Sequence, residues 1–205
     1  MGNLHITRRQ ILKGAGAAGI VTALAPVAAF ADEDEGAGRV RWDLIKFVNG
    51  CITPGGSCSA NAEGSTTITV TGHGTFPNVR NHCTRDVTGG GTWTVASGDT
   101  RCLPGTGSYR VTELLSWNPA PGGHVPASLE DCIPGGTKAT ATAGLAILRI
   151  RYEPDGRMGT LTVDCHLPGS PDCMFEGITA TRDYVDFSHF VPGGFTIFHY
   201  LRGED

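Results

Sequence analysis

Thr-Leu-Thr-Val-Asp-Cys (residues 160–165) and Met-Phe-Glu-Gly-Ile-Thr-Ala (residues 174–180) are the two halves of the stretch, residues 155–187, that organises this chain. Alternate residues of the first half are apolar, namely Leu161, Val163 and Cys165. This period of two is typical of a strand with one buried face. A Pro/Gly loop follows, and the second half places Glu176 on its apolar face. The stretch therefore predicts an antiparallel hairpin.

Short alternating segments recur on both sides of this hairpin. They cover residues 39–47, 66–72, 91–96, 108–117, 139–152, 184–190 and 195–201. In the first of them the apolar parity shifts between Leu44 and Ile45, which predicts a β-bulge. Within residues 108–117 the parity predicts one face made of Tyr109, Val111, Glu113, Leu115 and Trp117.

The composition favours an all-β fold. Thr, Val, Ile and Gly are frequent and no segment shows a helical period with caps, while Pro-Gly-Gly turns separate the segments. Many short strands with such turns predict a barrel or a sandwich. Glycines within and beside strands suit the bends of a closed barrel. We therefore predict a single small antiparallel β-barrel over residues 39–205, with a sandwich as the second choice.

The N-terminus has the features of a cleaved signal. Thr-Arg-Arg-Gln-Ile-Leu-Lys (residues 7–13) resembles the twin-arginine export signal, and an uncharged Ala/Gly-rich run follows. The run is too short and too weakly apolar for a spanning helix and ends in Ala-Phe-Ala (residues 29–31). We expect a signal over residues 1–31, a flexible acidic leader over residues 32–38, the Tat translocase as a partner during export, and a periplasmic or extracellular location without a stable membrane span.

Charge argues against nucleic acid as a partner. Removing the signal takes away three of the 16 basic residues and none of the 20 acidic ones, so the mature chain has a formal charge of −7. Proteins that bind phosphate backbones carry basic clusters, and no basic run appears here.

All seven cysteines follow the signal, and an exported protein favours disulfides. The spacing suggests three local pairs, Cys51–Cys58, Cys83–Cys102 and Cys165–Cys173, with Cys132 left over. An odd count leaves at least one thiol unpaired or paired between chains. No pair has Cys-x-x-Cys spacing, so we predict no metal site.

Three sequence blocks carry a resemblance to other proteins. They cover residues 87–93, 107–117 and 176–180, and they resemble a family of exported bacterial proteins without an established activity. The first block, Val-Thr-Gly-Gly-Gly-Thr-Trp, also looks like the Gly-rich strand turns of allene oxide cyclase and dirigent barrels. That likeness implies an eight-stranded barrel with an apolar cavity and cyclase or coupling-guiding chemistry.

Strand parity suggests one candidate site. Glu113, Glu176 and His199 each share a face with large apolar residues, so inward faces would bring three titratable groups into the barrel, beside Tyr109 and Trp117. The alternative is that these faces point outward, or that the acids pair with neighbouring Arg or Thr residues. No nucleophile elbow, phosphate loop, zinc motif or dinucleotide fingerprint is present, so no cofactor is predicted.

Three functions fit these features. The first is a barrel that binds a small, mostly apolar ligand in its interior through Glu113, Glu176, His199, Tyr109 and Trp117. The second is a cyclase or isomerase with a Glu/His acid–base pair. The third is a disulfide-stapled surface or interaction protein without a pocket. A filled interior favours the third.

The export signal gives the first prediction. Replacing both Arg8 and Arg9 by Lys should abolish or sharply reduce export, because the arginine pair is the feature that distinguishes this signal. Immunoblots of cytoplasmic and exported fractions measure the effect, and N-terminal sequencing of the exported chain should begin near Asp32. Undiminished export of the double variant would contradict the assignment.

Overall fold

The structure is a computed structural model and describes residues 38–80 and 82–202. The predicted signal, residues 1–31, and most of the predicted leader lie outside these ranges. Gly38, the last residue of that leader, already belongs to the first strand.

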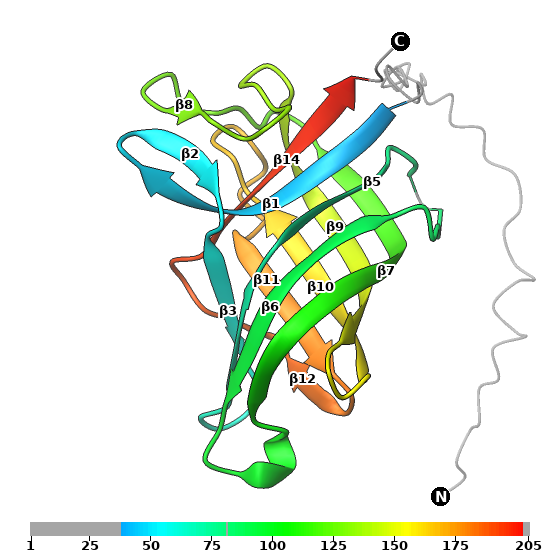
Figure 1. Cartoon of the computed structure of the whole chain (residues 1–205). Coiled ribbons are helices and arrows are strands. Elements are labelled where there is room, and N and C mark those ends of the chain that lie inside the picture. The colour runs from blue at the N-terminus through cyan, green and yellow to red at the C-terminus, as the bar shows by residue number, and fades with distance from the viewer. Residues whose placement is uncertain (1–37, 81, 203–205) are drawn as a thin grey trace, which may run out of the picture. The chain divides into compact units, whose positions relative to one another are not determined.

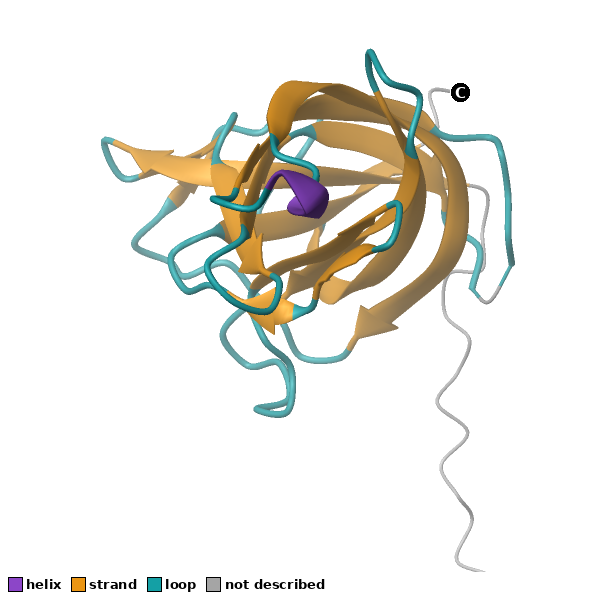
Figure 2. Cartoon of the chain, turned by 90° about the horizontal axis from the view of Figure 1, so that it is seen from below, coloured by secondary structure: helices purple, strands orange, loops and turns teal. Residues whose placement is uncertain are grey.

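A closed ring of six antiparallel strands forms the barrel (Figures 1 and 2). Its members are, in order around the ring, β1 (Gly38–Val48), β5 (His73–Pro77), β6 (Thr88–Ala96), β7 (Gly105–Ala120), β9 (Ala141–Tyr152) and β14 (Phe195–Arg202). Each strand pairs with the next, and β14 pairs with β1 from Gly38 opposite Arg202 to Ile45 opposite Phe195. The predicted all-β barrel is therefore confirmed.

The remaining elements extend the ring. They are β2 (Cys51–Pro54), β3 (Ser57–Asn61), β4 (Thr67–Thr71), the 3-10 helix η1 (Thr100–Cys102), β8 (Glu130–Asp131), β10 (Met158–Cys165), β11 (Gly177–Arg182), β12 (Val185–Phe187) and β13 (His189–Phe190). Strands β10 and β11 form the predicted antiparallel hairpin, with Val163 opposite Ile178. Within the described ranges, no helix is long and apolar enough to cross a membrane.

Large aromatic side chains fill the barrel. Trp42, Phe76, Trp117, Tyr152 and Phe198 are fully buried in one core cluster. The ring centroids of Trp117 and Phe198 lie 4.6 Å apart, and those of Phe76 and Trp117 lie 5.4 Å apart. These separations are those of favourable tilted aromatic pairs, so the interior is a packed core.

Two bulges in β7 change which residues face this core. The register with β9 shifts between Val111 and Glu113 and again between Leu114 and Ser116. Each bulge adds one residue to β7 and reverses the alternation beyond it. The inward residues are therefore Tyr109, Val111, Leu114 and Trp117. The predicted parity was wrong for Glu113 and Leu115.

Strand β1 lacks the bulge that the sequence suggested. Its register with β14 is continuous from Gly38 to Ile45. Leu44 faces the barrel core, whereas Ile45 faces outward into a second, smaller apolar cluster. Both residues are buried because both faces of the strand are covered there. Two consecutive apolar residues in the sequence therefore reflect two buried faces and not a bulge.

The glycine-rich block of residues 89–91 permits a close approach of neighbouring strands. A Cβ atom on Gly91 would lie 1.9 Å from the carbonyl oxygen of Thr71. No side chain fits at that distance, so glycine is required in β6 opposite the point where β4 passes into β5 at Gly72.

The disulfide of the structure joins Cys51 to Cys132, across a separation of 81 residues. The predicted Cys51–Cys58 pair is wrong. Cys58 lies in β3, where its side chain faces the barrel core, and its Sγ atom donates to the carbonyl oxygen of Phe195 at 3.6 Å. Cys132 is the cysteine that local pairing had left over.

The other two predicted pairs are also absent. Cys165 shares the inward face of β10 with Val163, is fully buried, and donates to the carbonyl oxygen of Thr196 at 3.3 Å, whereas Cys173 is exposed in the loop before β11. Cys83 and Cys102 carry free thiols as well. The strand face on which each cysteine lies decides its bonding more than its distance along the chain.

Truncating a core aromatic tests the filled interior. Phe198→Ala should lower the free energy of unfolding by about 3 to 5 kcal/mol, because it removes buried ring area and leaves a cavity between Phe76 and Trp117. Val48→Ala, at a side chain that is 42% exposed, should cost less than about 1 kcal/mol. Urea denaturation measures both values, and similar losses in the two variants would contradict a packed core.

Candidate functional site

A groove on the outside of the barrel is the candidate binding site. It has a volume of about 600 Å³ and is lined by Arg85, Thr112, Glu113, Arg149 and Met158. The bulge after Val111 turns Glu113 to this outer face, where its Oε2 accepts a hydrogen bond from the Nε of Arg149 at 2.8 Å. The exposed fractions of the two side chains are 21% and 47%.

The strands and one loop place these groups together. Arg149 lies opposite Glu113 in the β7–β9 pairing, and Thr112 donates to the carbonyl oxygen of Arg149 at 3.2 Å. Arg85 comes from the segment between β5 and β6. That segment is held against β7 by two backbone hydrogen bonds between Thr84 and Leu114.

Two further arginines lie on the same outer face of β7 and β9, at the next cross-strand pair of that face. Arg151 is two residues from Arg149 in β9, and Arg110 lies opposite Arg151 in β7. Both make only long contacts, of 3.5 and 3.6 Å, to Oε1 of Glu153. Arg85 and Arg149 therefore line the groove with one acid, Glu113, and Arg110 and Arg151 follow on the same face with Glu153.

Tyr109 and Trp117, which were predicted to line a ligand site, lie in the packed core. The Tyr109 hydroxyl donates to the carbonyl oxygen of Thr71 at 2.9 Å. The Trp117 indole donates to Oδ1 of Asn78 at 3.2 Å. Each polar atom is satisfied by the protein, as expected of an aromatic residue that fills a core.

Glu176 connects the loop after β10 to the beginning of β14. Its carboxylate accepts hydrogen bonds from the backbone N–H of His166, at 2.6 Å, and from that of Thr196. Burial raises the pKa of Glu176 to about 7, although the two N–H donors act in the opposite direction. Nearby Asp164 is buried too, and burial raises its pKa to about 6.

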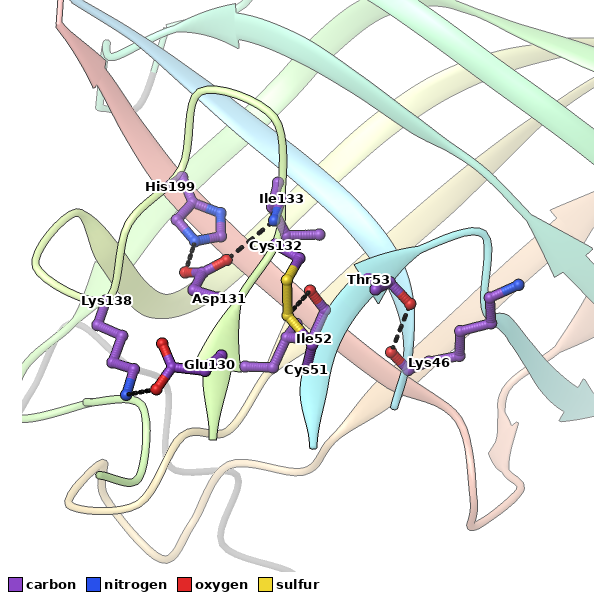
Figure 3. The surroundings of a disulfide bond; sticks show 10 residues. All are labelled: Lys46, Cys51, Ile52, Thr53, Glu130, Asp131, Cys132, Ile133, Lys138 and His199. Atoms are coloured by element: carbon purple, nitrogen blue, oxygen red, sulfur yellow. Dashed lines mark hydrogen bonds and ion pairs between the residues drawn. A yellow bond between two sulfur atoms is a disulfide. The ribbon is translucent and has the colours of Figure 1, made fainter. Parts of the chain in front are cut away.

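His199 is buried on the outer side of β14, away from the barrel core. Its Nε2 lies 2.7 Å from Oδ2 of Asp131, which belongs to β8 (Figure 3). Phe198, the preceding residue, points into the barrel. The prediction that His199 shares a face with Ile197 holds, but that face belongs to the second cluster outside the ring.

The structure does not bring Glu113, Glu176 and His199 together. Each has a different partner: Arg149, two backbone N–H groups, and Asp131. The prediction of one interior cavity shared by the three is wrong. Sequence reasoning missed Arg149 and Arg85, although the alternation of Arg149 and Arg151 with Leu148 and Ile150 was a signal for a charged outer face.

No cluster of three His, Cys, Asp or Glu side chains suited to a metal ion occurs in residues 38–80 and 82–202.

Comparison with known proteins adds information about the N-terminus. A family model described as the twin-arginine translocation pathway signal sequence matches residues 5–25. The chain is exported by the twin-arginine pathway. No curated protein and no solved structure matches the chain. The resemblances to an exported bacterial family and to allene oxide cyclase barrels therefore gain no support from relatives.

The raised carboxyl pKa values predict how stability depends on pH. The folded state holds the proton of Glu176 up to its raised pKa of about 7, whereas the ordinary pKa of an exposed Glu is 4.5. The free energy of unfolding should therefore fall as pH rises from about 4.5 to 7, by on the order of 2 kcal/mol from this group. Asp164, with a pKa of about 6, contributes with the same sign.

Urea denaturation between pH 4.5 and 7.5 measures this slope in the wild type and in Glu176→Gln, which should have a flatter profile. Glu130→Gln is the control, because the Glu130 side chain is 79% exposed and should leave the profile unchanged. A wild-type stability that rises over this range would contradict the assignment.

Proposed function

We propose that this exported barrel is a binding protein that holds a small anionic ligand in the arginine-lined groove outside β7 and β9. The observation that carries the proposal is the groove itself, in which Arg85 and Arg149 line one concave surface with Met158. The volume of about 600 Å³ lies within the range of small-molecule sites.

The distribution of charge supports an anionic ligand. The mature chain is acidic overall, yet two arginines and one acid line this groove, and Arg110 and Arg151 lie farther along the same face. Arg149 and Arg151 lie two residues apart on one strand, so their backbones are about 7 Å apart on the same face. Two guanidinium groups at that spacing suit a molecule with more than one carboxylate or phosphoryl group.

Glu113 gives the groove a second property. Its carboxylate holds Arg149 by the Nε atom and leaves the two terminal nitrogens of that guanidinium without a hydrogen-bond partner among the described residues. Those nitrogens are the donors that bind a carboxylate or phosphate in a bidentate manner. Met158, which is 44% exposed at the rim, offers contact to an apolar part of the ligand.

The packed interior argues against the first two predicted functions, the interior ligand site and the cyclase or isomerase with a Glu/His pair. A ligand inside the ring would have to displace the rings of Trp117 and Phe198. An acid–base pair made of Glu176 and His199 would need to join groups that have separate partners. The filled interior agrees with the third alternative, a disulfide-stapled surface or interaction protein without a pocket, in that the ring holds no ligand; the proposal differs from that alternative by placing a ligand in an outer groove.

Calorimetric titration with citrate, acetate and glycerol tests the proposal. Citrate should bind more tightly than acetate, glycerol should not bind, and added salt should weaken citrate binding through screening. Arg149→Gln should weaken citrate binding about tenfold, the usual effect of losing one charge-assisted hydrogen bond. Glu113→Gln should strengthen it, because an opposing negative charge is lost.

Arg101→Gln is the matched control. Arg101 is an exposed arginine that pairs with Asp99 beside η1, away from the groove. It should leave citrate binding unchanged. Absence of citrate binding at millimolar concentration, or equal weakening by Arg101→Gln and Arg149→Gln, would reject the groove as an anion site.

A further inference from the structure

The segment of residues 126–140 lies on the outer side of the barrel and is called the flap below. It contains β8, which pairs in parallel with β2 over two residue pairs only, Cys51 with Glu130 and Ile52 with Asp131. Two backbone hydrogen bonds accompany this pairing, from Glu130 to Gly50 and from Cys132 to Ile52, each 2.9 Å long. Figure 1 shows β2 and β8 side by side, beyond the ring.

The flap covers a buried ion pair. The His199 side chain is 0% exposed and that of Asp131 is 2% exposed. Oδ1 of Asp131 accepts from the backbone N–H of Ile133 at 3.1 Å, so the carboxylate belongs firmly to the flap. Gly136 lies over the imidazole, since a Cβ atom there would come within 2.8 Å of the ring. Covering of His199 therefore depends on the flap being in place.

Few apolar contacts hold the flap. The second cluster consists of five buried residues, Ile45, Ile52, Val125, Ile133 and Ile197. It is separate from the main core, to which the ring strands contribute. In addition, Nδ1 of His199 is buried without a hydrogen-bond partner among the described residues, so covering the imidazole has a desolvation cost. Opening of the flap would leave the barrel core intact.

The disulfide between Cys51 and Cys132 fastens the flap to β2 (Figure 3). Cys132 is exposed and Cys51 is partly exposed, so solutes can reach the bond. The cytoplasm keeps thiols reduced, and the space outside it favours disulfides. The twin-arginine signal moves this chain from the first environment to the second.

We propose that the Cys51–Cys132 disulfide is a redox latch, which forms on export and locks the flap over His199. The reaction is thiol–disulfide exchange with an external disulfide oxidant. The two cysteine thiols lose two protons and two electrons and form the S–S bond, while the disulfide of the oxidant is reduced to two thiols. Reduction reverses these steps and lets the flap open, exposing His199 beside its cross-strand neighbour Arg41.

Thiol trapping compares the chain before and after export. With each chain unfolded in denaturant so that buried Cys58 and Cys165 can react, the exported protein should be alkylated at five cysteines without reductant and at seven after reduction. The export-deficient Arg8→Lys/Arg9→Lys chain, kept in the cytoplasm, should be alkylated at seven without reductant. A bonded Cys51–Cys132 pair in the cytoplasmic chain would overturn the proposal that export closes the latch.

Hydrogen exchange measured by mass spectrometry tests the opening. In the exported protein, a phosphine reductant should speed exchange in residues 126–140 at least tenfold and leave β6, β7, β9 and β10 unchanged. Cys51→Ser/Cys132→Ser should behave like the reduced protein without reductant. Diethyl pyrocarbonate should modify His199 in these two forms and not in the oxidised wild type.

Cys173→Ser is the control, because it removes an exposed free thiol from another loop. It should respond to the reductant as the wild type does. Equal exchange of the flap in oxidised and reduced protein would overturn the latch. Loss of protection throughout the barrel on reduction would overturn it as well, because the disulfide would then stabilise the whole fold and not the flap.

Discussion

The pairing of β1 with β14 is the interaction on which this structure depends. It joins the first and last strands of the described chain, over eight residue pairs from Gly38–Arg202 to Ile45–Phe195. Without it the sheet would be open between these strands. Such a contact forms only after most of the chain has been positioned, because it spans nearly the whole domain.

Closing the ring in this way buries both faces of the pair. The inner face carries Trp42 and Phe198 into the aromatic core, and the outer face carries Ile45 and Ile197 into the second cluster. A strand pair with two apolar faces needs a cover on its outer side. The β2 hairpin and the flap supply that cover, which explains why an otherwise simple barrel has these additions beside β1.

The outer face also includes charged groups that need partners when they are covered. Asp43 is fully buried, and both of its carboxylate oxygens accept hydrogen bonds from Arg41 at 2.7 Å. Buried Asp131 contacts His199 through Oδ2 and accepts a hydrogen bond from the backbone N–H of Ile133 through Oδ1. Removing one partner of a buried pair leaves an uncompensated charge, which typically costs several kcal/mol. The contact between Asp131 and His199 therefore favours the flap as the segment that covers β14.

The sequence predicted the architecture because alternation and turns are local properties. The central hairpin, its inward face with Val163, and the all-β barrel all followed from a period of two and from Pro/Gly turns. The strands that sequence reasoning overlooked, such as β2 and β3, are short and contain few large apolar residues. Their position is set by pairing with longer strands.

The site residues were harder to predict because a single bulge reverses every residue beyond it. Tyr109 and Val111 face inward as expected, but the bulge before Glu113 turns that carboxylate outward to Arg149. No residue in residues 108–117 marks the bulge, since it depends on the register with β9. Parity errors of this kind move a group from one side of the sheet to the other.

The cysteines show the same limit for contacts distant in the sequence. Short separations in the sequence suggested local cysteine pairs, yet the two members of each local pair lie on different strand faces or loops. The disulfide instead connects two segments of similar sequence, Cys-Ile-Thr-Pro-Gly-Gly (residues 51–56) and Cys-Ile-Pro-Gly-Gly (residues 132–136). Their likeness was a signal that the two pack together, with Ile52 and Ile133 in one cluster.

This long separation gives the disulfide a particular energetic role. It connects two segments that are far apart in the sequence, whereas a local bridge over seven residues would have closed a single loop. The bond acts on the flap and β2, where few apolar contacts exist, and not on the aromatic core, which is stable by packing. Covalent and hydrophobic stabilisation are thus divided between the two sides of the β1–β14 pair. Under the proposed latch, the outer side responds to the redox state of its surroundings and the inner side does not.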